Sequence, residues 1–103
     1  MILVAIVCFT VSVNAESGNY CNQDGSRRLE LYNDAYFQLK ERGKNPITGT
    51  YEITSDNVII FRYSDGREYR GRFHRAIRER SGVLRSPAAI TYFEDQLVKN
   101  ACK

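Results

Sequence analysis

The sequence holds one histidine and three cysteines, and this scarcity limits the metal chemistry open to it. A usual zinc site needs three or four protein ligands, mostly His and Cys. Two of the cysteines are expected to form a disulfide, so His74 and the remaining cysteine cannot build such a site. We therefore expect no metal and no cofactor.

Two signatures of common enzymes are also missing. No glycine-rich phosphate loop precedes a helical pattern, and no Gly-x-Ser-x-Gly sequence is present to form the nucleophile elbow of a hydrolase. Low-complexity segments, linkers and long repeats are absent as well. With 103 residues, the chain predicts one domain.

Residues 1–15 lack charged side chains and are mostly apolar. They end in Val13-Asn14-Ala15, a cleavage site of the small-x-small type, and the composition turns polar at Glu16. The segment is shorter than the roughly 20 residues of a membrane span. It predicts a signal peptide, with a mature domain over residues 16–103 that is secreted or periplasmic and has no membrane span. The alternative is a buried N-terminal strand.

Cys8 falls inside this signal, which leaves Cys21 and Cys102 at the two ends of the mature chain. An even number of cysteines in an exported protein predicts a disulfide, and two cysteines permit only one intramolecular pair. Closing a loop of about 80 residues stabilises a fold by roughly 4–5 kcal/mol in the chain-entropy model.

Apolar and polar residues alternate through much of residues 29–73, which predicts half-buried strands. Three-residue loops keep the apolar residues of successive strands on one face, since a slip of one residue would reverse them. The loops are residues 33–35, 55–57 and 64–66. They pair Leu31 with Phe37, Leu29 with Leu39, Ile53 with Ile59, Tyr51 with Phe61, Phe61 with Tyr69 and Arg62 with Glu68.

These hairpins predict a mainly β fold, an antiparallel up-and-down meander that forms a small barrel or a strongly twisted sheet. Gly66 is expected in the left-handed conformation of its loop. Residues 41–48 form a longer connection, and Gly71 suggests a bend or bulge, as at a barrel corner. Ser81-Gly82 is a predicted turn.

The C-terminal segment permits two structures. Ser86-Pro87 could begin a helix with an apolar stripe. Alternatively, a strand over residues 89–93 turns at Glu94-Asp95 into a second strand over residues 96–100, and the β-prone sequence Ile90-Thr91-Tyr92-Phe93 favours this hairpin.

The run Gly49-Thr50-Tyr51-Glu52-Ile53-Thr54, followed by residues 57–61 and by Asp65-Gly66, resembles the repeating hairpin of small exported lipocalin-like β-domains. The resemblance covers residues 27–73 and implies a barrel fold. Such domains serve as ligand carriers, envelope stress proteins and inhibitors of host enzymes, so the resemblance implies a fold more than an activity.

Arginine is concentrated in residues 62–85. The predicted register places Arg62, Arg70, Arg72 and His74 on the outward face of one hairpin, which we call the β-sheet face. Guanidinium groups bind phosphates, sulfates and carboxylates through paired hydrogen bonds. We expect a monomeric binding protein that contacts an acidic protein or a polyanion there. The structural alternative is a solvated strand face that discourages edge pairing.

Two other functions stay open. Glu52 and Glu68 are expected on the same face as Arg70, Arg72 and His74, the residue types of a ribonuclease-like acid–base enzyme. A structural envelope protein without activity is the third possibility.

Tyr20, Tyr32 and Tyr36 are predicted at the surface or rim, where Tyr32 opposite Tyr36 could form a small contact patch.

Overall fold

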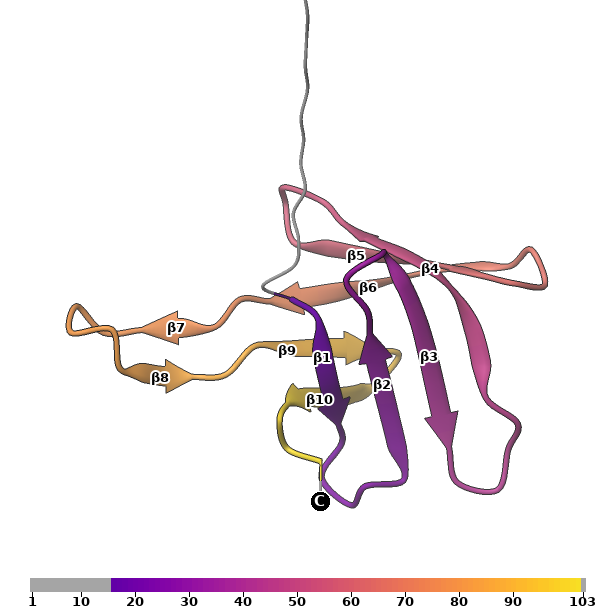
Figure 1. Cartoon of the computed structure of the whole chain (residues 1–103), viewed down its shortest axis with the longest axis horizontal. Helices are drawn as coiled ribbons and strands as arrows, with labels where there is room; N and C mark the ends of the chain where they lie inside the picture. Colours follow the sequence, from indigo (N-terminus) through magenta and orange to yellow (C-terminus); the bar gives the residue numbers. More distant parts are fainter. Residues whose placement is uncertain (1–15, 103) are drawn as a thin grey trace, which may run out of the picture.

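The computed structural model describes residues 16–102, so the predicted signal peptide lies outside the described residues. Within that range the chain forms β-strands and no helix (Figure 1). The strands are β1 Gly18–Cys21, β2 Arg27–Leu31, β3 Tyr36–Glu41, β4 Ile47–Ile53, β5 Val58–Tyr63, β6 Glu68–His74, β7 Ile77–Arg78, β8 Leu84–Ser86, β9 Ala89–Tyr92 and β10 Asp95–Lys99.

Eight of these strands close into an antiparallel barrel in the order β1-β10-β9-β6-β5-β4-β3-β2, which confirms the predicted mainly β meander. The remaining two, β7 and β8, pair only with each other. The architecture is compatible with a lipocalin-like barrel.

The three predicted hairpin registers are confirmed pair by pair. Leu31 lies opposite Phe37, and Phe61 lies between Tyr51 and Tyr69. In each loop the third residue has a positive φ: Ala35 at 72°, Asn57 at 64° and Gly66 at 95°. All three connections therefore share the left-handed residue that a three-residue hairpin loop requires.

The barrel closes where the two ends of the chain meet. Strand β1 pairs with β2 on one side and with β10 on the other, where Cys21 lies opposite Val98. The predicted Cys21–Cys102 disulfide is present and spans 81 residues. Strand β1 had no counterpart among the predicted strands, because four residues give too short a pattern to recognise.

The C-terminal segment is the predicted hairpin and not a helix. The turn falls at Phe93-Glu94, one residue earlier than expected, since Tyr92 lies opposite Asp95. The connection between β3 and β4 is also shorter than predicted, because both strands extend into residues 41–48. Hydrogen bonds between paired strands can extend them beyond the residues that the pattern of a single strand indicates.

The barrel interior is filled by large side chains. The fully buried ones are Tyr20, Phe37, Phe61, Leu29, Leu39, Ile59, Ile90 and Leu97. Phe61 packs edge-to-face against Phe37 and Tyr92, with ring centroids 5.0 and 5.6 Å apart. The Tyr63 and Tyr92 hydroxyls, 2.7 Å apart, satisfy each other inside the barrel. Burial raises the pKa of both phenols.

Gly71 marks a close approach between strands. Its pairing with β5 is unbroken, so the bulge suggested at this position is not present. A Cβ atom at Gly71 would lie 2.5 Å from the Thr91 carbonyl oxygen of β9. The absence of a side chain therefore lets the backbones of β6 and β9 approach each other closely.

Residues 75–86, which we call the arm, leave the barrel as a narrow ribbon. They comprise β7, a turn and β8, and they connect β6 to β9. Figure 1 shows the arm extending sideways from the barrel. The predicted Ser81-Gly82 turn lies at its tip, where Gly82 has a φ of 91°.

Candidate functional site

The β-sheet face is outward, as the alternation predicted. Arg62 on β5 and Arg70, Arg72 and His74 on β6 are all exposed. Along each strand, these four residues alternate with residues that face the barrel interior. The structure thus brings the four predicted residues onto one surface of the β5–β6 hairpin.

Ion pairs neutralise part of this face. Arg62 Nη1 lies 2.8 Å from Glu52 Oε1, and its Nε lies 3.6 Å from Glu68 Oε1. Glu68 Oε2 is also 3.2 Å from Arg70 Nε. The hydrogen bond to Glu52 raises the pKa of Arg62. Carboxylates therefore already occupy two of the guanidinium groups that were expected to bind a partner.

The charged side chains also shield an apolar residue. Ile60 has the outward parity of Arg62 but is only 5% exposed. Glu52 and Arg70 flank it directly in the register. Long polar side chains often lay their carbon stems over apolar surface in this way. Part of the arginine on this face thus has a structural role.

His74 lies apart from the carboxylates of the face. Its Nε2 is 2.8 Å from Thr91 Oγ1 on β9. Glu68 is six residues away on the same strand, a separation of about 20 Å at 3.3 Å per residue. Glu52 is on β4, two strands from β6. No acid–base pair that includes His74 and either carboxylate is assembled.

The three predicted surface tyrosines have different environments. Tyr20 was expected at the surface or rim, and this prediction was wrong: it is fully buried, because β1 directs it into the barrel. Its hydroxyl donates a hydrogen bond to the Glu16 carbonyl oxygen, 2.7 Å away, and burial raises its pKa. Tyr32 and Tyr36 are exposed, as predicted.

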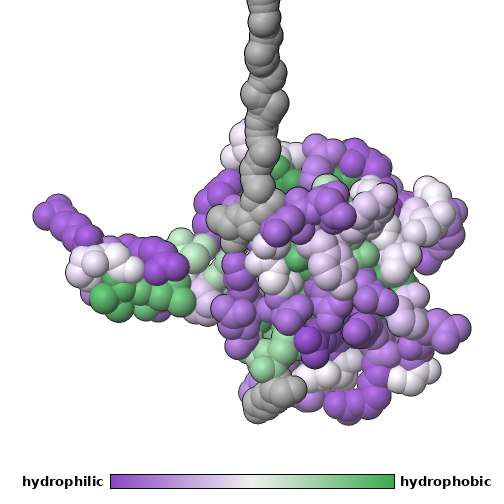
Figure 2. Space-filling model, viewed as in Figure 1, coloured by the Kyte–Doolittle hydropathy of each residue, from purple (hydrophilic) through white to green (hydrophobic). Residues whose placement is uncertain are grey.

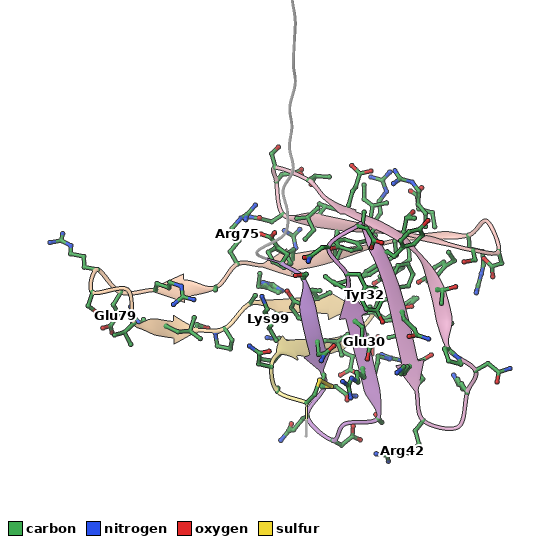
Figure 3. All side chains as sticks on the ribbon, in the orientation of Figure 1. Glu30, Tyr32, Arg42, Arg75, Glu79 and Lys99 are labelled. Carbon is green, nitrogen blue, oxygen red and sulfur yellow. A yellow bond between two sulfur atoms is a disulfide. The ribbon has the colours of Figure 1, made fainter. Side chains whose placement is uncertain are left out.

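Tyr32 belongs to a polar cluster at the surface of β2 and β3 (Figure 3). Its hydroxyl donates to Glu30 Oε1 at 2.6 Å, and Glu30 Oε2 lies 3.2 Å from Arg28 Nε and 3.5 Å from Lys40 Nζ. The Tyr32 hydrogen bond, with help from the two cations, holds the pKa of the Glu30 carboxyl below its usual range. The cluster secures a nearly buried carboxylate.

The arm has a larger excess of positive charge than the β-sheet face, where carboxylates offset part of it. It contains Arg75, Arg78, Arg80 and Arg85 against one acid, Glu79. Its net charge of +3 equals that of the whole chain, so the rest of the sequence is neutral in sum. At the base of the arm, Arg75 Nη1 lies 3.5 Å from Glu16, while Arg78 donates to the Gly82 carbonyl oxygen.

The arm also carries exposed apolar side chains. Ile77, Val83 and Leu84 are 53%, 60% and 46% exposed. Figure 2 shows hydrophobic surface gathered on the arm along its β8 side. Sequence reasoning noted the arginines but missed this ribbon, since two strands of two and three residues give almost no periodic signal.

Among residues 16–102, no group of three or more His, Cys, Asp or Glu side chains is placed to hold a metal ion. The same part of the chain holds no helix long and apolar enough to cross a membrane. Comparisons with protein-family models, with curated proteins and with solved structures find no match to this chain.

Proposed function

We propose that this is an exported binding protein that contacts an anionic partner through a basic surface. That surface runs from the β-sheet face, which consists of Arg62, Arg70, Arg72 and His74, onto the arm. The observation that carries the proposal is the location of the whole net charge of +3 in residues 75–86. The disulfide fits an oxidising compartment.

The ion pairs divide the basic surface into a stronger and a weaker part. Arg62 forms ion pairs with Glu52 and Glu68. Arg70 forms one with Glu68, so an incoming anion must compete with these carboxylates. The arm has only Glu79 as an acid of its own. Because exposed pairs of this kind are weak, the β-sheet face still contributes, but the arm supplies the larger attraction.

Binding is favoured over catalysis by the placement of His74. An acid–base mechanism needs its groups within reach of one bond of the substrate. His74 forms a hydrogen bond with Thr91, and it is separated by about 20 Å from Glu68 along the strand that both share. A ribonuclease-like reaction therefore has less support than a contact surface.

The test measures binding of the exported protein to heparin, to RNA and to an acidic protein at several salt concentrations. Arg78→Glu/Arg80→Glu changes the arm and Arg70→Glu/Arg72→Glu changes the β-sheet face. Arg42→Glu/Lys44→Glu changes the net charge equally in the loop after β3, where Figure 3 shows Arg42 far from the arm.

We expect affinity to fall steeply with salt, and each released counterion to contribute to the slope. The arm variant should lose most of the affinity, the β-sheet face variant less and the loop variant least. Equal losses in all three would show that only net charge matters and would contradict a defined site. RNA cleavage that disappears in His74→Ala would instead support the enzyme. No binding would favour a structural role.

A further inference from the structure

The arm has more apolar surface than the binding of a simple polyanion requires. Of the large hydrophobic residues that are exposed between residues 16 and 102, the aliphatic ones all lie in the arm: Ile77, Val83 and Leu84. A two-stranded ribbon has no second layer to cover them. A phosphate or sulfate chain would contact the arginines and leave these side chains in water. Their exposure therefore favours a partner with apolar groups of its own.

The arm also has open strand edges. Every strand of the barrel has a neighbour on both sides, whereas β7 and β8 each have one. An unpaired edge presents backbone N–H and C=O groups that an extended segment of another chain can bind as an added strand. Within the described part of the chain, β7 and β8 are the strands that lack a neighbour along the whole of one side.

A hollow at the base of the arm adds a place for a side chain. Its volume is about 330 Å³, near the lower end of small-molecule pockets. Phe73, Leu84 and Pro87 give it an apolar lining, and Arg75, Arg78 and Lys99 stand around it. The hollow is continuous with the arm because Arg78 and Leu84 belong to β7 and β8.

The register orients Leu84 and leaves Arg85 at a bulge. Arg78 lies opposite Leu84, so both side chains are on the face that lines the hollow. A β-bulge separates this pair from the pair of Ile77 with Ser86, and Arg85 is the extra residue at the bulge, with an exposed side chain. An extended segment beside β8 would therefore meet the apolar Leu84 and the guanidinium of Arg85 at neighbouring positions.

We propose that the arm docks an extended acidic segment of a partner protein in which apolar and acidic residues alternate. The segment adds a strand to the open edge of β8, places apolar side chains toward Leu84 and the hollow, and sets carboxylates against Arg85. This proposal rests on the proposed function and names the partner. A second copy of this chain is disfavoured, since each arm carries a net charge of +3.

The probe is a fluorescein-labelled ten-residue peptide of alternating Val and Glu, followed by fluorescence anisotropy. One matched peptide has the same composition in two blocks. Another keeps the alternation but carries N-methyl groups on alternate amides, which removes donors for strand pairing. Decaglutamate, heparin and vesicles of anionic phosphatidylglycerol complete the series. All are tested against the exported protein and its Leu84→Ser and Arg85→Glu variants.

We expect the alternating peptide to bind at least tenfold more tightly than the block and N-methylated peptides. It should slow hydrogen exchange of the amides in residues 83–86. Leu84→Ser should weaken this peptide about tenfold and leave heparin unchanged, because it removes only apolar contact. Arg85→Glu should weaken both. Unchanged unfolding curves of the variants would show that the barrel is intact.

The outcomes separate the two proposals. Equal binding of all the peptides, or sensitivity to Arg85 but not to Leu84, would overturn strand docking and leave the anionic contact standing. Binding to the vesicles alone, lost in Leu84→Ser, would assign the arm to a lipid surface and also overturn it. Failure of every probe to bind would overturn both proposals.

Discussion

The barrel and the arm differ in what holds their strands. In the barrel each strand is paired on both edges, and the side chains between them are buried. In the arm two short strands pair only with each other, and their aliphatic side chains are half exposed. Burial of apolar surface supplies most of the stability of a fold. The barrel therefore supplies most of the stability of the fold, whereas the side chains of the arm are available for contact with a partner.

The disulfide should give the largest effect, because it closes the barrel and does not touch the arm. Cys21→Ala/Cys102→Ala releases a constraint on a segment of 81 residues, and the free energy of unfolding should fall by about 4–5 kcal/mol. Urea unfolding of the variant, and of the unchanged protein with and without reductant, measures this loss. A loss below about 1 kcal/mol would mean that β1–β10 pairing alone closes the barrel.

The same type of truncation should change the free energy of unfolding by very different amounts in the two regions. Phe61→Ala removes a fully buried ring that packs on Phe37 and Tyr92, and the free energy of unfolding should fall by about 3–5 kcal/mol. Leu84→Ala, in the arm, should change it by less than about 0.5 kcal/mol. Thermal unfolding of the two variants makes the comparison directly. Equal losses would show that the arm is part of the cooperative core.

Gly71 tests the close approach of β6 and β9. In Gly71→Ala the new methyl group meets the Thr91 carbonyl oxygen at 2.5 Å, and the strands must move apart at a cost of about 1–3 kcal/mol. Thr50→Ala, on the exposed side of β4, is the control. We expect the loss in chemical unfolding, and a neutral Gly71→Ala would argue against the tight contact.

Glu30 should give the smallest effect, and that effect depends on pH. Its pKa is lowered in the folded protein, chiefly by the Tyr32 hydroxyl. The stabilisation is therefore complete above the unfolded pKa of about 4.3 and is lost as the pH falls through the lower folded value. Glu30→Gln should cost about 1 kcal/mol at pH 7 and little once the carboxyl is protonated. Unfolding curves of the unchanged protein and of Glu30→Gln, recorded from about pH 2 to about pH 7, measure the difference in the free energy of unfolding. A difference independent of pH would assign the effect to packing.

The candidate site was only partly predictable. Alternation placed Arg62, Arg70 and Arg72 on one face, because strand parity is a local property. The predicted register also paired Arg62 with Glu68, but it did not show that Glu52 would share the same guanidinium. Nor could it show that His74 would lie beside Thr91, because that contact depends on β9 becoming the neighbour of β6.

The sequence by itself determined the three hairpin registers, the pairing of Cys21 with Cys102 and the β character of the C-terminal segment. Each depends on information close together in the chain or on the cysteine count. Tertiary structure alone decided the closure through β1, the burial of Tyr20 and the projection of the arm. Closure joins segments from opposite ends of the chain, and the arm begins where the pairing of β6 with β9 ends, at His74 and Ala89. Long-range pairing of this kind leaves no periodic signal in any one strand, since its energy is shared between distant residues.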